Sequence, residues 1–344
     1  MAKARRPEAV DKLLDISSTG GIYMGSPEDR AEDVGGIIHY EHIQLYVPDL
    51  HQAYIFYCDG LGFTQDPGTW SKQRGGFKVL WFNLGRHQIH IVQKDVHQDT
   101  KGYITVVVPD AELVKKRLAA VKEALEGTKF RSEMRSVHGE QRLFATDPWG
   151  QDYMVLQSGQ AGDFTMSMGM SELQLPVHPG TARAIAEFYK RVFHARIETP
   201  ISGESVVYVG PGTKFRFTEN AALGPVTNKK FTELYDGWHA AIYVSDFSGA
   251  FRAMEAADLI FTEHGFFDAD ISGLRDAQRF HQFRFQDIVA LEDLEGDGWS
   301  VKKGEVIYQF GNEVRSLCHP KFMRALYNRH GDNFDVPEDI QTIV

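Results

Sequence analysis

The chain has 344 residues, of which 42% are hydrophobic and 24% are charged, and its formal net charge is −10. This composition is that of an ordinary folded protein, and the length suggests two domains or a repeated architecture rather than one simple core. The acidic balance argues against a nucleic acid or an anionic membrane surface as a partner, because either would need a clustered basic surface.

Cysteine content and hydropathy restrict the cellular setting. The two cysteines, Cys58 and Cys318, make a disulfide framework improbable. No apolar run approaches the roughly 20 residues that span a bilayer, and no apolar signal core follows the basic start of the chain. We therefore expect a cytoplasmic protein, and a homodimer is compatible with these features.

After an arm of residues 1–36, four strand-like runs recur along the chain. Each run alternates apolar with other residues and precedes a segment with helical periodicity. Aligning the last valine of each run gives spacings of 61, 69 and 67 residues, between Val47, Val108, Val177 and Val244. A period near 65 residues that is held three times indicates four copies of one unit.

Each run leads into a helix. Asp49, Asp110 and Asp246 are placed as N-caps, where a carboxylate accepts hydrogen bonds from the free amides of the first turn. Helical spacing predicts one buried face in each unit. The predicted faces are Ala53, Phe56, Tyr57 and Leu61; Leu113, Leu118, Val121 and Leu125; Ile185, Phe188, Tyr189 and Val192; and Phe247, Phe251 and Met254.

Further strands follow each helix. In the first unit they include residues 77–84 and 89–92, with Gly85 at the turn, and in the second unit the turn at 147–150 precedes residues 153–156. A βαβββ unit with an open curved sheet cannot close a core alone. We therefore predict an α+β protein in which four βαβββ modules pair into two open mixed β-barrels.

Three stretches resemble the vicinal oxygen chelate superfamily, which includes glyoxalases, fosfomycin-resistance enzymes, bleomycin-binding proteins and extradiol dioxygenases. They are His42-Ile-Gln-Leu-Tyr-Val-Pro-Asp-Leu50, then Phe56-Tyr57 with Leu61-Gly62-Phe63, and the turn Asp147-Pro-Trp-Gly150. The resemblance implies one domain of modules one and two over residues 37–160 and a second of modules three and four over 161–330. Residues 331–344 would form a tail.

The resemblance also implies where metal ligands would lie. In this superfamily they come from the start of a module's first strand and from its last strand, and two modules share one divalent metal. The first-strand position corresponds to His42, Tyr103, Glu172 and His239, and the last-strand position to His90, Met154, Arg216 and Glu313. Met154 is no ligand for a hard metal, so the two halves depart from the usual His-His-Glu set.

Two pairings of the modules are open. If adjacent modules pair, Glu172, His239 and Glu313 would form the site; if the outer modules pair, His42 and His90 would join His239 and Glu313. Consecutive elements are usually neighbours in space, so we favour the first arrangement.

Every candidate residue has a structural alternative. The histidines could be satisfied packing residues, Glu172 a solvated edge carboxylate, and Glu313 half of a surface ion pair. His281 is a candidate proton shuttle or a polar residue on an outer strand face. Arg315 could bind a substrate carboxylate through a bidentate pair of hydrogen bonds, or it could be part of a structural salt bridge.

The favoured function is that of a divalent-metal enzyme, with Fe(II) preferred over Mn(II) or Zn(II), acting as a ring-cleaving dioxygenase on a small aromatic substrate. This follows from the resemblance and from the four-module layout. Two alternatives remain: a metal-dependent isomerase or lyase of the glyoxalase type, and a metal-free binding protein. The aromatic walls of the latter would be Trp70, Trp81, Phe82, Trp149 and the phenylalanines of the fourth unit.

Overall fold

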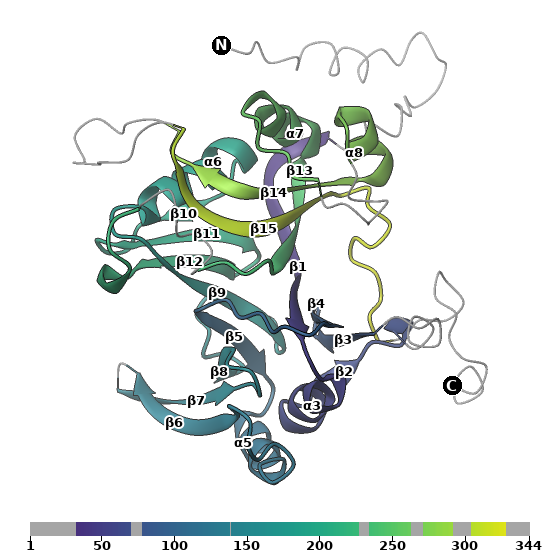
Figure 1. Cartoon of the computed structure of the whole chain (residues 1–344), viewed down its shortest axis with the longest axis vertical. Helices are drawn as coiled ribbons and strands as arrows, with labels where there is room; N and C mark the ends of the chain where they lie inside the picture. The colour runs from purple at the N-terminus through teal and green to yellow at the C-terminus, as the bar shows by residue number, and fades with distance from the viewer. Residues whose placement is uncertain are drawn as a thin grey trace.

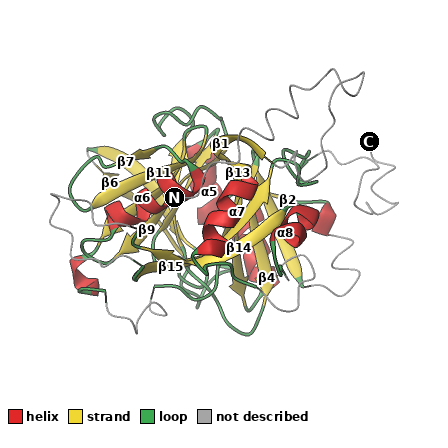
Figure 2. Ribbon diagram, turned by 90° about the horizontal axis from the view of Figure 1, so that it is seen from above, coloured by secondary structure: helices red, strands yellow, loops and turns green. Residues whose placement is uncertain are grey.

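The computed structural model describes residues 32–69, 78–137, 139–226, 234–262, 271–291 and 304–327. They form two mixed β-sheets with short helices packed against them (Figures 1 and 2). The predicted α+β class is confirmed.

The first sheet joins the beginning of the chain to its end (Figure 1). It has seven strands in the order β14-β15-β13-β1-β4-β3-β2. Their bounds are β1 Glu32–Val47, β2 Thr64–Gln65, β3 Val79–Leu84, β4 His87–Gln93, β13 His239–Asp246, β14 Gln282–Val289 and β15 Val306–Ser316.

The second sheet is built from the middle of the chain. It has eight strands in the order β10-β11-β12-β9-β5-β8-β7-β6. Their bounds are β5 Tyr103–Val108, β6 Arg131–Val137, β7 Glu140–Thr146, β8 Asp152–Gln157, β9 Gly169–Val177, β10 Ile197–Glu198, β11 Glu204–Gly210 and β12 Thr213–Glu219.

The favoured pairing of adjacent units is wrong. β1 pairs antiparallel with β13, which joins unit one to unit four, and β5 pairs antiparallel with β9, which joins unit two to unit three. Units one and two do contact each other, but through their helices: Arg117 of unit two donates to the carbonyl of Cys58 in unit one at 2.6 Å. The first strand of unit one is therefore left to pair with that of unit four.

The helices begin where the sequence predicts. The carboxylates of Asp49, Asp110 and Asp246 accept amide hydrogen bonds at the starts of their helices. The helices are α3 Leu50–Tyr54, which continues as a π-helical turn Ile55–Gly60 (η2), α5 Ala111–Ala120, α6 Ala182–Phe193, the 3₁₀ turn η3 Ala221–Leu223, α7 Phe247–Ala256 and α8 Leu274–Phe280.

The predicted buried faces are confirmed in units one, three and four. In unit two the prediction is wrong at one position: Leu113 is 52% exposed, and Val114 is buried in its place. Val114 lies four residues before Leu118, so it shares that residue's face of the helix. Each helix thus buries one face against the sheets, as the periodicity predicted.

Strand register tests the predicted ligand positions directly. In every unit the first and last strands are parallel neighbours, and the residue three before the aligned valine faces the predicted last-strand position. The pairs are Gln44 with His90, Thr105 with Met154, Gln174 with Arg216, and Ala241 with Glu313. Those four alignments are confirmed, while superposition of the four backbones stays a prediction.

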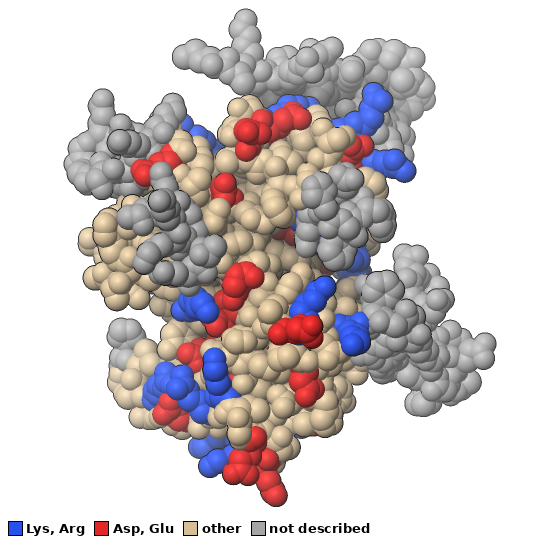
Figure 3. All heavy atoms as spheres, viewed as in Figure 1, with Lys and Arg blue, Asp and Glu red and all other residues tan. Residues whose placement is uncertain are grey.

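The first strand begins earlier than the sequence predicts. β1 begins at Glu32, inside the predicted arm, while residues 1–31, the tail 331–344 and Trp70 lie outside the described residues. Cys58 and Cys318 are free thiols, as expected. Within the described part of the chain no helix has the length and apolar character to cross a membrane. Figure 3 shows acidic and basic side chains interspersed on the face viewed.

Candidate metal centre

A bulge in β1 creates the local geometry of the site. Strand alternation would send Glu41 and His42 to opposite faces, but the register with β13 shifts between Tyr40 and His42. Such a shift re-aims side chains locally. As a result the two neighbours meet, with Nδ1 of His42 at 2.9 Å from Oε2 of Glu41, and both are buried.

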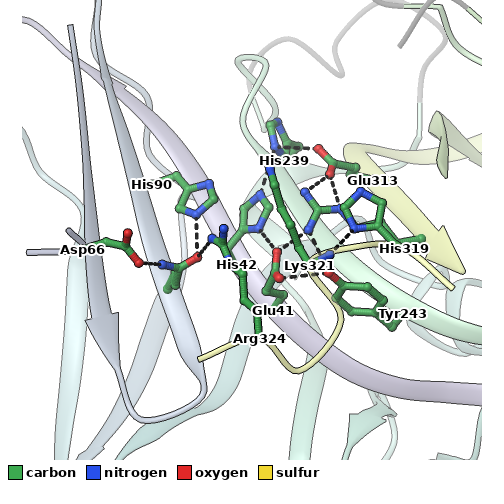
Figure 4. Close-up of polar contacts among 12 residues, drawn as sticks. Glu41, His42, Asp66, His90, His239, Tyr243, Glu313, His319, Lys321 and Arg324 are labelled. Atoms are coloured by element: carbon green, nitrogen blue, oxygen red, sulfur yellow. Dashed lines mark hydrogen bonds and ion pairs between the residues drawn. The ribbon is translucent and has the colours of Figure 1, made fainter. Parts of the chain in front are cut away.

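Three side chains from three strands converge beside this bulge. His42 of β1, His239 of β13 and Glu313 of β15 each offer one ligand atom, and these atoms lie within 4.8 Å of one another. Nε2 of His239 lies 3.4 Å from Nε2 of His42 and 3.4 Å from Oε2 of Glu313. Figure 4 shows the three side chains pointing toward one another.

These distances and donor types fit a divalent metal. Two donor atoms bound about 2.1 Å from one ion, roughly 90–110° apart, are themselves about 3.0–3.4 Å apart. The set of two imidazoles and one carboxylate is the donor combination of non-haem Fe(II) sites, and it also suits Zn(II) and Mn(II). The residues present therefore fit a resident metal ion.

A buried hydrogen-bond network surrounds the three candidate ligands. Arg315 forms ion pairs with both Glu41 and Glu313, so it links β15 to β1. The hydroxyl of Tyr243 donates to Oε1 of Glu41 at 2.9 Å and accepts from Arg315 at 3.0 Å. Arg284 of β14 donates to Oε2 of Glu313 at 2.7 Å. The carboxylates are thereby fixed in position before any ligand enters.

Burial sets the protonation of the two histidines. Burial lowers the pKa of His42, although the hydrogen bond to Glu41 acts in the opposite direction. Burial also lowers the pKa of His239 well below its ordinary value. Burial alone would raise the pKa of Glu313, but the guanidinium groups of Arg315 and Arg284 hold it well below its usual range. At neutral pH the cluster thus presents two neutral imidazoles and a carboxylate, the forms that bind metal.

His90 lies beside this group, at the position in unit one that corresponds to Glu313 in unit four. Its ring is stacked between two others, with centroids 3.8 Å from that of His42 and 4.3 Å from that of Trp81. Nε2 of His90 lies 3.1 Å from the amide oxygen of Gln88. The stack supports the ring of His42 from one side.

The structure does not bring Glu172 to this group. It belongs to β9 in the other sheet, where its carboxylate accepts two hydrogen bonds from Arg216, at 2.9 and 2.8 Å. Arg216 also pairs with Glu204. The first- and last-strand positions of unit three therefore hold an ion pair within that unit.

His281 and Arg315 take structural positions. The sequence predicts His281 on a strand, but it ends α8 in the left-handed conformation, with φ of 57°, and its carbonyl accepts from Ser316 N at 2.9 Å. Arg315 faces the same way as Glu313, as expected, and pairs with it. This contact realises the salt-bridge alternative for Arg315.

Sequence reasoning missed Glu41, Tyr243 and Arg284. Alternation assigned Glu41 to the face away from His42, and no local signal revealed the bulge that reverses this. Tyr243 and Arg284 gain their roles only from strands that lie side by side in the fold, β13 with β1 and β14 with β15. Adjacency of an acidic residue to a candidate ligand histidine is the one signal that could have pointed to Glu41.

Comparison with known proteins shows the fold. No protein-family model matches the sequence, and no curated protein does. Among solved structures, maize glyoxalase I matches with a TM-score of 0.51 at 13% identity, covering 83% of this chain and 93% of that one. A mutant of 4-hydroxymandelate synthase from Streptomyces coelicolor matches with a TM-score of 0.29 at 15% identity, covering 82% and 93%. The chain has the vicinal oxygen chelate fold, which confirms the resemblance at that level.

Proposed function

We propose that the protein is a divalent-metal-dependent enzyme of the vicinal oxygen chelate type whose metal is held by His42, His239 and Glu313. The observation that carries this proposal is the convergence of two imidazole nitrogens and one carboxylate oxygen within 4.8 Å, from strands far apart in the sequence. Buried neutral histidines beside a buried carboxylate are otherwise costly to assemble.

The favoured reaction is ring cleavage of a small aromatic substrate by dioxygen, with Fe(II) as the metal and Mn(II) or Zn(II) as alternatives. A metal with open positions would act as a Lewis acid on substrate oxygens, and iron would also bind dioxygen. Two histidines with one carboxylate are the donor set of non-haem Fe(II) oxygenases, which supports iron, and three protein donors would leave coordination positions open for substrate.

The chain's own residues orient the donors. Glu41 accepts the Nδ1 proton of His42 and so directs Nε2 of that ring toward His239. Arg315 holds Glu41 and Glu313 at a fixed separation. Trp81 is 6% exposed and lies against His90, so it forms an aromatic wall next to the candidate ligands.

One observation favours the second candidate, a metal-free protein that binds a small molecule. Glu313 already has two guanidinium partners, Arg284 and Arg315, which satisfy its charge. Of the aromatic walls expected for this function, Phe82 and Trp149 are buried in the main core and Trp70 lies outside the described residues, whereas Trp81 lies beside the histidines. Metal content separates the two candidates.

The test is elemental analysis of protein purified without chelator or histidine tag. We expect about one divalent ion per chain, and at least a tenfold fall in metal affinity for His239→Ala, because a ligand is removed from a preformed site. His97→Ala is the matched control, since that histidine is exposed and lies on a loop. Unchanged metal content in His239→Ala would contradict the proposal.

Activity assays then divide the enzyme classes. Oxygen uptake with catechol as the probe supports the dioxygenase, whereas conversion of methylglyoxal with glutathione and no oxygen uptake supports the isomerase or lyase. Protein that binds no metal under either condition would point to the binding protein instead.

A further inference from the structure

The segment after β15 returns to unit one. Residues 317–327, the C-terminal segment, are tied to the β3–β4 hairpin by hydrogen bonds near its end. The carbonyl of Leu326 accepts from the side-chain amide of Asn83, and the hydroxyl of Tyr327 accepts from the amide of Gly85, both at 2.8 Å. The C-terminal segment therefore lies across the strands that carry Trp81 and His90.

This segment places two cations beside the candidate metal centre. The ammonium of Lys321 and the guanidinium of Arg324 each lie 5.4 Å from the ring centroid of Trp81. Arg324 also donates to the amide oxygen of Gln88 at 3.0 Å. Since Trp81 stacks on His90 and His90 on His42, the two cations border the group that converges in Figure 4.

Lys321 differs from the other cations around the centre. Arg284 and Arg315 form ion pairs with buried carboxylates, whereas none of the ion pairs among the described residues includes Lys321. Burial, together with the charges of Arg315 and Arg324, lowers the pKa of Lys321 to about 7. A half-buried ammonium held against an aromatic ring with no carboxylate partner is ready to receive an anion.

The charge around the centre also favours an anionic ligand. The cations are Arg284, Arg315, Lys321 and Arg324, and the carboxylates among the groups that interact with them are Glu41, Asp66 and Glu313. A divalent metal would add two positive charges to this group. Concentrated positive charge in a partly desolvated site is stabilised by a ligand of opposite sign.

We propose that the substrate is a small aromatic carboxylate, and that Lys321 of the C-terminal segment receives its carboxylate. This proposal rests on the proposed function, because it places the aromatic part of the substrate near Trp81 and the metal-binding residues. The side-chain nitrogen of Lys321 lies against the ring of Trp81, so it is in position before the substrate binds, and a bound carboxylate favours its protonated form. Arg324 strengthens the positive potential at the same wall.

The test compares two probes of equal size, phenylacetate and phenylacetamide, by calorimetric titration of the full chain with and without Mn(II). We expect phenylacetate to bind at least about tenfold more tightly in both conditions. In Lys321→Met this ratio should approach one, whereas Lys321→Arg, which keeps the charge, should retain a ratio well above one. Lys115→Met, on the exposed face of α5, is the matched control and should leave the ratio unchanged.

A ratio near one in the wild type, or a ratio that survives Lys321→Met, would overturn the proposal. The wild-type titration decides even if one variant fails to fold. Failure of the proposed function is seen separately: a chain that binds no metal but keeps the Lys321-dependent ratio retains the carboxylate site. A chain that binds metal and consumes oxygen, but binds the two probes equally well, keeps the proposed function and contradicts the carboxylate site.

Discussion

At the scale of single residues, the candidate centre depends on groups that need not touch a metal. Glu41 is buried and makes three contacts, with His42, Tyr243 and Arg315. Its carboxylate sets the tautomer of His42, because an Nδ1 proton that is donated to Glu41 leaves Nε2 as the free donor atom. Carboxylates in this position orient ligand histidines and raise their basicity.

Glu41→Gln should lower the affinity for the metal by about 10- to 100-fold while the three candidate ligands remain. The amide is close in size to the carboxylate but loses the charge that faces Arg315. Metal titration with a competing chelator measures the change. Glu172→Gln is the control, since it breaks a similar Arg–Glu pair in the other sheet; equal effects of the two variants would refute the assigned role of Glu41.

At the scale of elements, the alignment of β13 with β15 brings His239 and Glu313 together. The two strands are parallel, with His239 facing Gly311 and Ala241 facing Glu313. A Cβ at Gly311 would lie 2.8 Å from both Cβ of His239 and the carbonyl oxygen of Trp238. Only glycine allows this close approach, since backbone atoms cannot yield at that distance.

Gly311→Ala should therefore force the two strands apart, with a loss of about 1–3 kcal/mol in the free energy of unfolding and weaker metal binding. Chemical denaturation and metal titration measure the two effects. Gly273→Ala is the control, because its new Cβ would lie 4.0 Å from a carboxylate oxygen of Glu255, which is an ordinary contact distance. A Gly311→Ala protein with wild-type stability and metal affinity would show that the spacing is not required.

At the scale of the whole molecule, two kinds of contact join the repeated units. Units one and two pack through their helices, whereas the sheets join unit one to unit four and unit two to unit three. The sheets meet near the β3–β4 hairpin, where the amide of Met170 donates to Nδ1 of His87 at 3.2 Å. The candidate centre thus draws its residues from units one and four, which lie far apart in the sequence.

A double-mutant cycle tests the joining of units one and four. The hydroxyl of Tyr243 and the carboxylate of Glu41 are 202 residues apart in sequence and 2.9 Å apart in space. Glu41→Gln and Tyr243→Phe should couple by about 1 kcal/mol in the free energy of unfolding, measured in the presence of chelator.

The comparison pair is Glu41→Gln with Tyr57→Phe, because Tyr57 bonds to Asp147 and Tyr153 and shares no partner with Glu41. That pair should be additive to within about 0.5 kcal/mol. Additivity in the Glu41–Tyr243 cycle as well would contradict the observed contact between β1 and β13.

The sequence by itself determined the local structure and the candidate positions. Alternation and capping located the strands that end at Val47, Val108 and Val177 and the helix starts at Asp49 and Asp110, because these depend on neighbours within a few residues. The resemblance also located the last-strand positions, and Glu313, chosen as the best carboxylate of its segment, does face the first strand of unit four.

Only the tertiary structure decided which positions share a site. Spacing along the chain says nothing about which strand edges meet. The preference for adjacent modules made Glu172 the favoured partner of His239, and only the pairing of β1 with β13 shows that His42 takes that place. The bulge that turns Glu41 toward His42 and the return of Lys321 over Trp81 are likewise long-range outcomes. They depend on contacts between residues at opposite ends of the chain, which local patterns do not record.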